Sequence, residues 1–123
     1  MSSSNVELAE LSSANLPEPV PYAVVIPPGY SDSAPLPLCI LLMGGGGSRD
    51  NLIQCQPLFD QWWAEGVLAP LVFATPSPGM SYYLEDPAHG ARWQSFLVED
   101  FIPHLRATCN GGKDARSTAI TGM

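Results

Sequence analysis

The stretch LCILLMGGGG, residues 38–47, constrains the fold more than any other part of the sequence. It is a continuous run of six apolar residues that stops at four glycines. Such a run is typical of a strand buried on both faces of a sheet, and burial on both faces usually means a parallel sheet with helices on either side. The stretch therefore predicts an α/β protein.

Two more apolar runs, at residues 22–26 and 71–74, and a run of small and β-branched residues at 117–120 predict further strands. Together with two predicted helices, they give the order strand, strand, helix, strand, helix, strand. Helices that alternate with apolar strands favour a mostly parallel sheet with flanking helices. Residues 1–19 are predicted to be a flexible leader, and residues 20–123 to form the folded part.

Capping residues and apolar spacing place the two helices. The first is predicted between Ser48 or Asp50, as its N-cap, and Gly66, with Pro57 in its first turn. The second is predicted over residues 92–108 from an apolar stripe at intervals of three and four, with a kink at Pro103.

The amino-acid composition of the chain limits the kinds of partner that it can bind. The chain has a formal net charge of −7 with only five Lys and Arg residues, so it lacks the cations that neutralise phosphates in a nucleic-acid complex. Cys39, Cys55 and Cys109 match no metal-ligand spacing, and no metal is expected. The sequence contains neither a run of roughly 18 to 20 apolar residues nor the basic start of an export signal, which predicts a soluble cytoplasmic protein with no membrane contact.

The glycine run after the buried strand is the strongest chemical signal. A bare backbone can present its N–H groups to an anion or to a developing oxyanion. A phosphate loop would need a lysine after the glycines, and residue 48 is serine. An oxyanion loop of the HGGG type fits the position better, while a plain turn without a ligand is the remaining alternative.

Three stretches in order then resemble one family. PYAVVIPPGYSDSAPLPLCILLMGGGGSRDN, ARWQSFLVEDFIPHLRATCN and RSTAITGM resemble the esterase branch of the α/β-hydrolases, which contains esterase D (S-formylglutathione hydrolase), the feruloyl esterases and the mycolyltransferases. The resemblance covers most of residues 22–123. In that family, the strand that RSTAITGM resembles is followed by Ser-x-Gly-Gly. Thr121, Gly122 and Met123 therefore resemble the residues that lead into a G-x-S-x-G nucleophile elbow.

This resemblance implies the N-terminal half of a serine esterase acting on a carboxylic ester or thioester, without a cofactor. Backbone N–H groups at Gly44 and Gly45 would form part of the oxyanion hole. The catalytic serine is expected directly after Met123, and the histidine and acid beyond it, so the chain alone is predicted to be inactive. The family has a histidine where this sequence has Met43.

Other residues keep two interpretations. Tyr82, Tyr83 and Trp93 flank a loop expected at the carboxyl edge of the sheet, where they would bind substrate or simply belong to the core. A triad of Ser48, Asp86 and His89 is disfavoured, since Ser48 is better explained as a helix cap. The alternative function is a non-catalytic hydrolase-like protein that binds a partner, with self-association through an exposed sheet edge.

Overall fold

The computed structural model describes residues 4–28, 36–42, 48–77, 85–86, 91–109 and 115–122. Its centre is a five-stranded sheet in the order β1-β2-β4-β3-β7. The strands of this sheet are β1 (Asn5–Leu11), β2 (Val20–Ile26), β3 (Leu38–Leu42), β4 (Val72–Pro76) and β7 (Thr118–Gly122).

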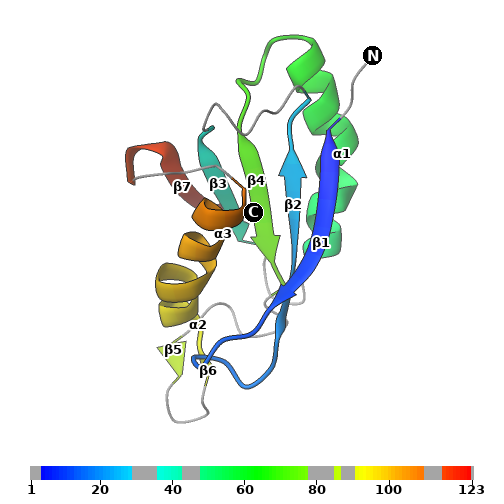
Figure 1. Ribbon diagram of the computed structural model, residues 1–123. Coiled ribbons are helices and arrows are strands. Elements are labelled where there is room, and N and C mark those ends of the chain that lie inside the picture. The colour runs from blue at the N-terminus through cyan, green and yellow to red at the C-terminus, as the bar shows by residue number, and fades with distance from the viewer. Residues whose placement is uncertain are drawn as a thin grey trace.

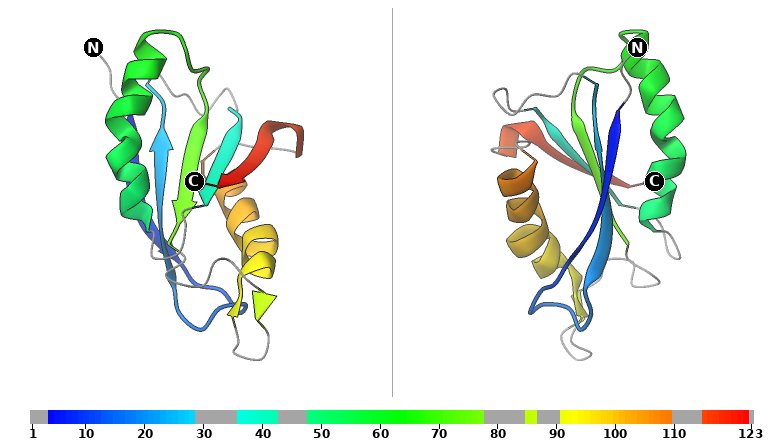
Figure 2. Two further views of the ribbon diagram at one scale, coloured as in Figure 1. Left: turned by 180° about the vertical axis from the view of Figure 1, so that it is seen from behind. Right: turned by 45° about the vertical axis from the view of Figure 1, so that its right-hand side comes forward.

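Helices cover both faces of the sheet (Figures 1 and 2). Helix α1 (Arg49–Ala64) lies on one face. A helical segment on the other face consists of α2 (Trp93–Ser95), the π-helical η2 (Phe96–Phe101) and α3 (Ile102–Thr108). The remaining described elements are short: the paired strands β5 (Glu85–Asp86) and β6 (Ala91–Arg92), and the 3₁₀ turn η3 (Ala115–Ser117).

The sheet is mixed, and only β2 runs against the other strands. Strands β4, β3 and β7 are mutually parallel, whereas β2 is antiparallel to both of its neighbours, β1 and β4. This agrees with the α/β architecture and mostly parallel sheet that the sequence predicts. The helices α1 and α2–α3 serve as the crossovers between the parallel strands, which is why they lie on the sheet's two faces.

The N-terminus differs from the predicted flexible leader. All seven residues of β1 pair with β2, from Asn5 opposite Ile26 to Leu11 opposite Val20. Val6 packs against the core beneath α1, and Ala9 and Leu11 pack against the core on the opposite face. The prediction failed because the residues of β1 are half-buried or exposed and have a weak local pattern, so that pairing with the buried β2 fixes their conformation.

Local signals set the ends of α1. Ser48 is the N-cap, as predicted, and Gly66 follows the helix with φ of +73°. The N–H groups of Gly66 and Val67 donate to the carbonyls of Trp63 and Trp62, the pair of bonds that defines a Schellman motif. Pro57 lies inside the helix and not in its first turn. Its side chain is exposed, so the ring lies outside the packed face of the helix.

The second helix occupies the predicted residues with a different internal geometry. Directly before Pro103, the N–H of Ile102 bonds to the carbonyl of Leu97, five residues back. This π-helical register leaves Pro103 in the first turn of α3, where its lack of an N–H is tolerated.

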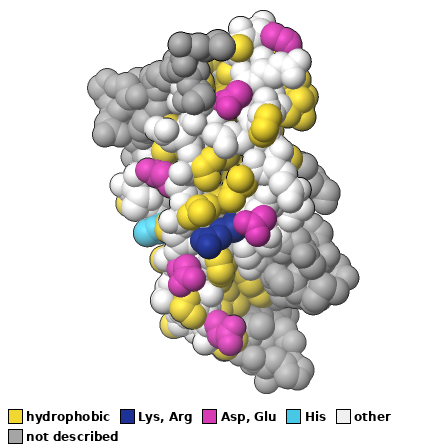
Figure 3. All heavy atoms as spheres, turned by 90° about the vertical axis from the view of Figure 1, so that its right-hand side faces the viewer, with side chains coloured by type: hydrophobic (Ala, Val, Ile, Leu, Met, Phe, Trp, Pro, Cys, Tyr) yellow, Lys and Arg dark blue, Asp and Glu magenta, His cyan; other side chains and the backbone are white. Residues whose placement is uncertain are grey.

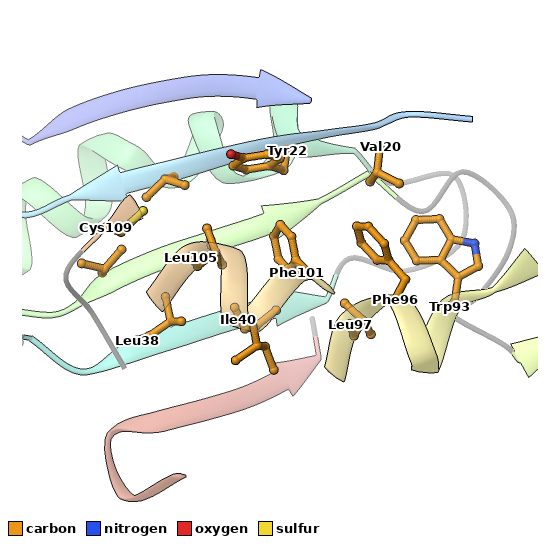
Figure 4. Close-up of a cluster of buried hydrophobic side chains, with 14 of the residues drawn as sticks. Val20, Tyr22, Leu38, Ile40, Trp93, Phe96, Leu97, Phe101, Leu105 and Cys109 are labelled. Carbon is orange, nitrogen blue, oxygen red and sulfur yellow. The ribbon is translucent and has the colours of Figure 1, made fainter. Parts of the chain in front are cut away.

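Two hydrophobic cores lie on the two faces of the sheet. Beneath α1, the ring of Phe59 stacks on that of Phe73 with centroids 4.2 Å apart. The other core is aromatic: Tyr22 meets Phe101 edge-on at 5.3 Å, and Phe96 stacks near Phe101 at 5.7 Å (Figure 4). These cores hold the strands and helices in register and so position the loops at the sheet's edges. No helix among the described residues is long and apolar enough to cross a membrane.

Candidate functional site

The candidate site lies at the carboxyl edge of the parallel strands, where β3 and β7 end together. The ladder between them pairs Leu41 with Thr121 and Leu42 with Gly122. The segment that contains the glycine run begins directly after Leu42, and Gly122 is the next-to-last residue of the chain. The β3 and β7 backbones therefore deliver two glycine-containing segments to adjacent points of one edge.

The described residues resume at Ser48, which is the N-cap of α1 and forms a capping box with Asn51. The Ser48 hydroxyl accepts from the Asp50 N–H at 3.2 Å, and the Ser48 N–H donates to Oδ1 of Asn51 at 2.9 Å. The Asn51 N–H in turn donates to the Ser48 carbonyl at 3.0 Å. The N-terminus of α1 is thus firmly defined at the same carboxyl edge.

The end of β4 contacts the start of α1. Oγ of Ser77, the residue after β4, accepts from the Arg49 N–H at 2.8 Å, and the Ser77 N–H donates to the Pro21 carbonyl at 2.8 Å. The Arg49 guanidinium donates to the Ala9 carbonyl of β1 at 3.1 Å. Sequence reasoning missed this network, because only the tertiary fold brings Ser77 next to Arg49.

A buried hydroxyl lies two residues before Ser77. Thr75 has no exposed surface, and its Oγ1 has no hydrogen-bond partner in the part of the chain that the structure describes. Thr75 pairs with Ala23 and has the same strand parity as Phe73, both of which belong to the core beneath α1. An unpaired buried hydroxyl is unusual in a native fold and marks this end of β4 as polar.

Most of the residues predicted for the site fall outside the described ranges. These are Gly44 and Gly45 of the oxyanion loop, Met43, and the aromatic residues Tyr82 and Tyr83. Their predicted roles stay predictions. The same applies to the disfavoured triad, since His89 and the side chain of Asp86 are not described; Ser48 itself is the helix cap.

Trp93 is described and lies in the core. Only 7% of it is exposed, and its ring meets Phe96 edge-on at 5.5 Å (Figure 4). Of the two roles that the sequence leaves open for Trp93, the structure therefore favours packing. A substrate contact by Trp93 remains a prediction without support from its position.

Among the described residues, two titratable groups have clearly raised pKa values. Burial, then the nearby Cys109 and Glu7, raise the pKa of Tyr22, whose hydroxyl lies 3.0 Å from Nε2 of His104. Burial raises the pKa of the Cys39 thiol. Both shifts keep these groups neutral, which suits a core position better than a nucleophile. Among the described residues, no cluster of His, Cys, Asp and Glu is arranged to bind a metal.

Comparison with solved structures connects this architecture to esterases. No family model matches the sequence. A ferulic acid esterase superposes with a TM-score of 0.87 at 21% identity, over 98% of this chain and 49% of its own. A CE1 ferulic acid esterase from Anaeromyces mucronatus gives 0.79 at 16% identity, over 100% of this chain and 50% of its own. An S-formylglutathione hydrolase from Agrobacterium tumefaciens gives 0.73 at 16% identity, over 98% and 49%.

These likenesses establish the fold. The chain has the architecture of part of an α/β-hydrolase domain, and it spans about half the length of the solved esterases that it matches. The fold that the resemblance implied is thereby confirmed. At these identities a shared fold does not carry over an activity.

Proposed function

We propose that this chain supplies the oxyanion-hole half of a serine esterase that hydrolyses small carboxylic esters or thioesters. The observation that carries the proposal is the pairing of Leu42 with Gly122. It supports the proposal because an α/β-hydrolase oxyanion hole combines one N–H from the loop after this kind of strand with the N–H that follows the nucleophile. These two donors must lie close together, and β3 and β7 are neighbours in the sheet.

In this proposal the chain contributes electrostatic stabilisation. N–H groups at Gly44 and Gly45 bind the oxygen that becomes negative when a serine attacks the ester carbonyl. The serine follows Met123 in the whole protein, a histidine takes its proton, and an acid orients the histidine. The histidine gives that proton to the alcohol or thiol, which leaves as its bond to the acyl carbon breaks, and an acyl-enzyme remains. Water then hydrolyses the acyl-enzyme, which releases the carboxylic acid and restores the serine. Side chains and backbone dipoles suffice for this chemistry, so no cofactor is proposed.

Substrate recognition is assigned to aromatic residues after β4. Tyr82 and Tyr83 follow that strand in the sequence, so the topology directs their segment to the carboxyl side of the sheet, where ligands bind in open α/β folds. We propose that they contact the acyl or aryl part of the substrate. Trp93, buried beside Phe96, is left to the core.

The experiment that tests the proposal is a kinetic comparison of Gly45→Val with the parent sequence in a protein that includes the residues after Met123. A side chain at residue 45 would displace N–H donors that stabilise the transition state. In other enzymes the loss of one such donor lowers kcat by about 100- to 1000-fold. We expect that fall in kcat with little change in KM. Gly66→Val, at the far end of α1, controls for lost stability, because its φ of +73° strains a valine there as well. A Gly45→Val enzyme that folds and keeps its kcat would contradict the proposal.

A non-catalytic, partner-binding protein is the second candidate, favoured by the difference between the two sheet edges. On β1, Glu7 and Glu10 are exposed, and the Arg49 guanidinium donates a hydrogen bond to the Ala9 carbonyl. Exposed charges and backbone groups that already have a partner both hinder the pairing of another strand with this edge. The opposite edge, β7, carries no charged side chain, and Ile120 is 48% exposed. A protein that self-associates through β7 would elute from gel filtration with an apparent mass above 13.1 kDa. A protein that elutes as a monomer at both low and high salt would count against this function.

A further inference from the structure

A hollow with a volume of about 580 Å³ lies beside the C-terminal end of α1 and has no role in the function proposed above. Its apolar walls include Pro27, Pro28, Leu68 and Pro70. Pro70 precedes β4 and Pro27 follows the antiparallel β2, so the hollow lies at the sheet edge opposite the candidate site (Figure 1). Small-molecule sites have volumes of roughly 300–1,000 Å³, so this hollow is large enough for a small organic ligand.

Three residues of α1 line the hollow from one face of the helix. They are Asp60, Trp63 and Ala64, and their spacing of three and four residues places them on that one face. Among the described residues that line the hollow, Asp60 is the one that carries a charge. The small side chain of Ala64 belongs to the same wall, so a larger residue there would occupy the hollow.

The Asp60 carboxylate is held in place by the N-terminal segment. The Ser4 N–H donates to Asp60 Oδ1 at 3.1 Å. Ser4 is itself fixed by Gln56, whose Nε2 donates to the Ser4 carbonyl at 3.1 Å and to Ser4 Oγ at 2.9 Å. The other carboxylate oxygen of Asp60, Oδ2, has no hydrogen-bond partner among the described residues. The hollow thus has a fixed carboxylate with one oxygen left for a ligand.

Trp63 supplies an aromatic wall whose polar group is already used. Its Nε1–H donates to the Ala69 carbonyl at 3.0 Å. Its ring lies 6.1 Å from that of Phe59 and 6.0 Å from that of Phe73, measured between centroids. These contacts fix the ring against the core beneath α1, while the half-buried side chain also lines the hollow. What the indole can still offer a ligand is its π system, which attracts a cation.

The end of α1 adds to the negative potential at the hollow. The C-terminus of a helix carries a partial negative charge, and the last turn of α1 contains no basic residue to offset it. Figure 3 shows this side of the molecule: the dark blue basic atoms lie near its middle, and acidic side chains are visible nearer its upper end, where α1 ends. The local field and the net charge of −7 therefore both favour a positively charged ligand.

We propose that this hollow binds a small organic cation with an apolar body, of the arylalkylammonium class. The Asp60 carboxylate and the Trp63 ring bind the ammonium group, and the prolines and Leu68 pack against the aryl part. Charge selects this class over a neutral ligand, because a neutral molecule gains little from Asp60 or from the helix dipole. The site shares no residue with the proposed oxyanion hole, so the inference stands independently of the esterase function.

An NMR titration of the 123-residue chain with benzylammonium at neutral pH tests the inference. The indole N–H signals are followed, and Trp63→Phe identifies the signal of Trp63. Trp93, buried in the core on the other face of the sheet, is the internal reference. We expect a saturable shift of the Trp63 signal and none of the Trp93 signal. Benzyl alcohol has almost the same shape without the charge, so it should bind at least about fivefold more weakly.

Three variants test the residues that carry the argument. Asp60→Asn keeps an oxygen for the Ser4 N–H and removes the charge, so benzylammonium should bind about fivefold more weakly. Asp50→Asn is the matched control: it removes the same charge from an exposed residue at the other end of α1 and should keep the parent affinity. Ala64→Leu changes an exposed residue, so the fold is kept, and the leucine should fill the hollow and abolish the shift of the Trp63 signal.

Several results would overturn the inference. Equal affinity for benzyl alcohol and benzylammonium would show an apolar hollow with no preference for a cation. Parent affinity in Asp60→Asn would remove the carboxylate from the site. Equal weakening in Asp50→Asn would mean that the acidic chain as a whole attracts the cation. A Trp63 signal that does not move, or that moves equally in Ala64→Leu, would place any binding elsewhere. None of these results depends on esterase activity.

Discussion

Replacing Thr75 by valine should make the protein more stable. The Thr75 side chain is fully buried, and its hydroxyl has no partner among the described residues. Valine replaces that hydroxyl with a methyl group of similar size, so the packing beneath α1 is kept while the cost of burying an unpaired polar group disappears. That cost is about 1–3 kcal/mol. We expect the free energy of unfolding to rise by at least about 1 kcal/mol, with a Tm about 3–5 °C higher.

Urea unfolding followed by tryptophan fluorescence measures this change. The midpoint should rise at an unchanged m-value, since valine alters stability and not the surface exposed on unfolding. Thr108→Val is the matched control: its hydroxyl donates to the His104 carbonyl at 2.9 Å, so the same substitution should leave stability unchanged or lower it. A fall in the free energy of unfolding of about 1 kcal/mol or more in Thr75→Val would contradict this prediction, because it would mean that the Thr75 hydroxyl has a hydrogen-bond partner.

Four further predictions follow from the fold and the site. Phe101→Ala should lower the free energy of unfolding by about 3–5 kcal/mol in urea titrations, because Phe101 is fully buried between Tyr22 and Phe96; a loss below about 1 kcal/mol would contradict that packing. Gly66→Ala should cost about 1 kcal/mol by the same measurement, since its φ of +73° strains any L side chain although the space around it is open; a neutral result would argue against the left-handed cap. Because burial raises the pKa of the Cys39 thiol, the folded state keeps that proton to a higher pH than the unfolded state does, so stability should fall as the pH rises through the thiol's ordinary pKa. The urea midpoint should therefore fall less steeply with pH in Cys39→Ala than in the parent. An unchanged dependence of the midpoint on pH would exclude the thiol as the cause of that fall. The chain alone should not hydrolyse p-nitrophenyl acetate above a heat-treated control, and saturable hydrolysis would reveal a different active site.

Much of the fold could be predicted because its signals are local. β3 is a continuous apolar run, Ser48 and Gly66 mark the ends of α1, and the stripe from Trp93 to Leu105 marks the second helix. Each depends on residues a few positions apart, where side-chain periodicity and capping act.

The features that could not be predicted depend on contacts across the fold. β1 is a strand because β2 pairs with it, and β4 lies between β2 and β3 although it follows both in the sequence. Pro57 is tolerated within α1 because packing of Leu52 and Phe59 against the sheet holds the helix. At the site, the sequence indicated the glycine run and the end of β7, but Ser77 and Thr75 gain their significance only from their neighbours in space.

In the proposed function, β3 and β7 bring an oxyanion loop beside a nucleophile. The most direct test of this arrangement uses the protein that is encoded when the reading frame is followed past the codon for Met123. This protein is exposed to a fluorophosphonate probe and then analysed by mass spectrometry. We expect a single adduct on a serine directly after Met123, within Ser-x-Gly, and loss of that adduct in the serine-to-alanine variant. A different residue at that position, or a folded protein that stays unlabelled, would contradict it.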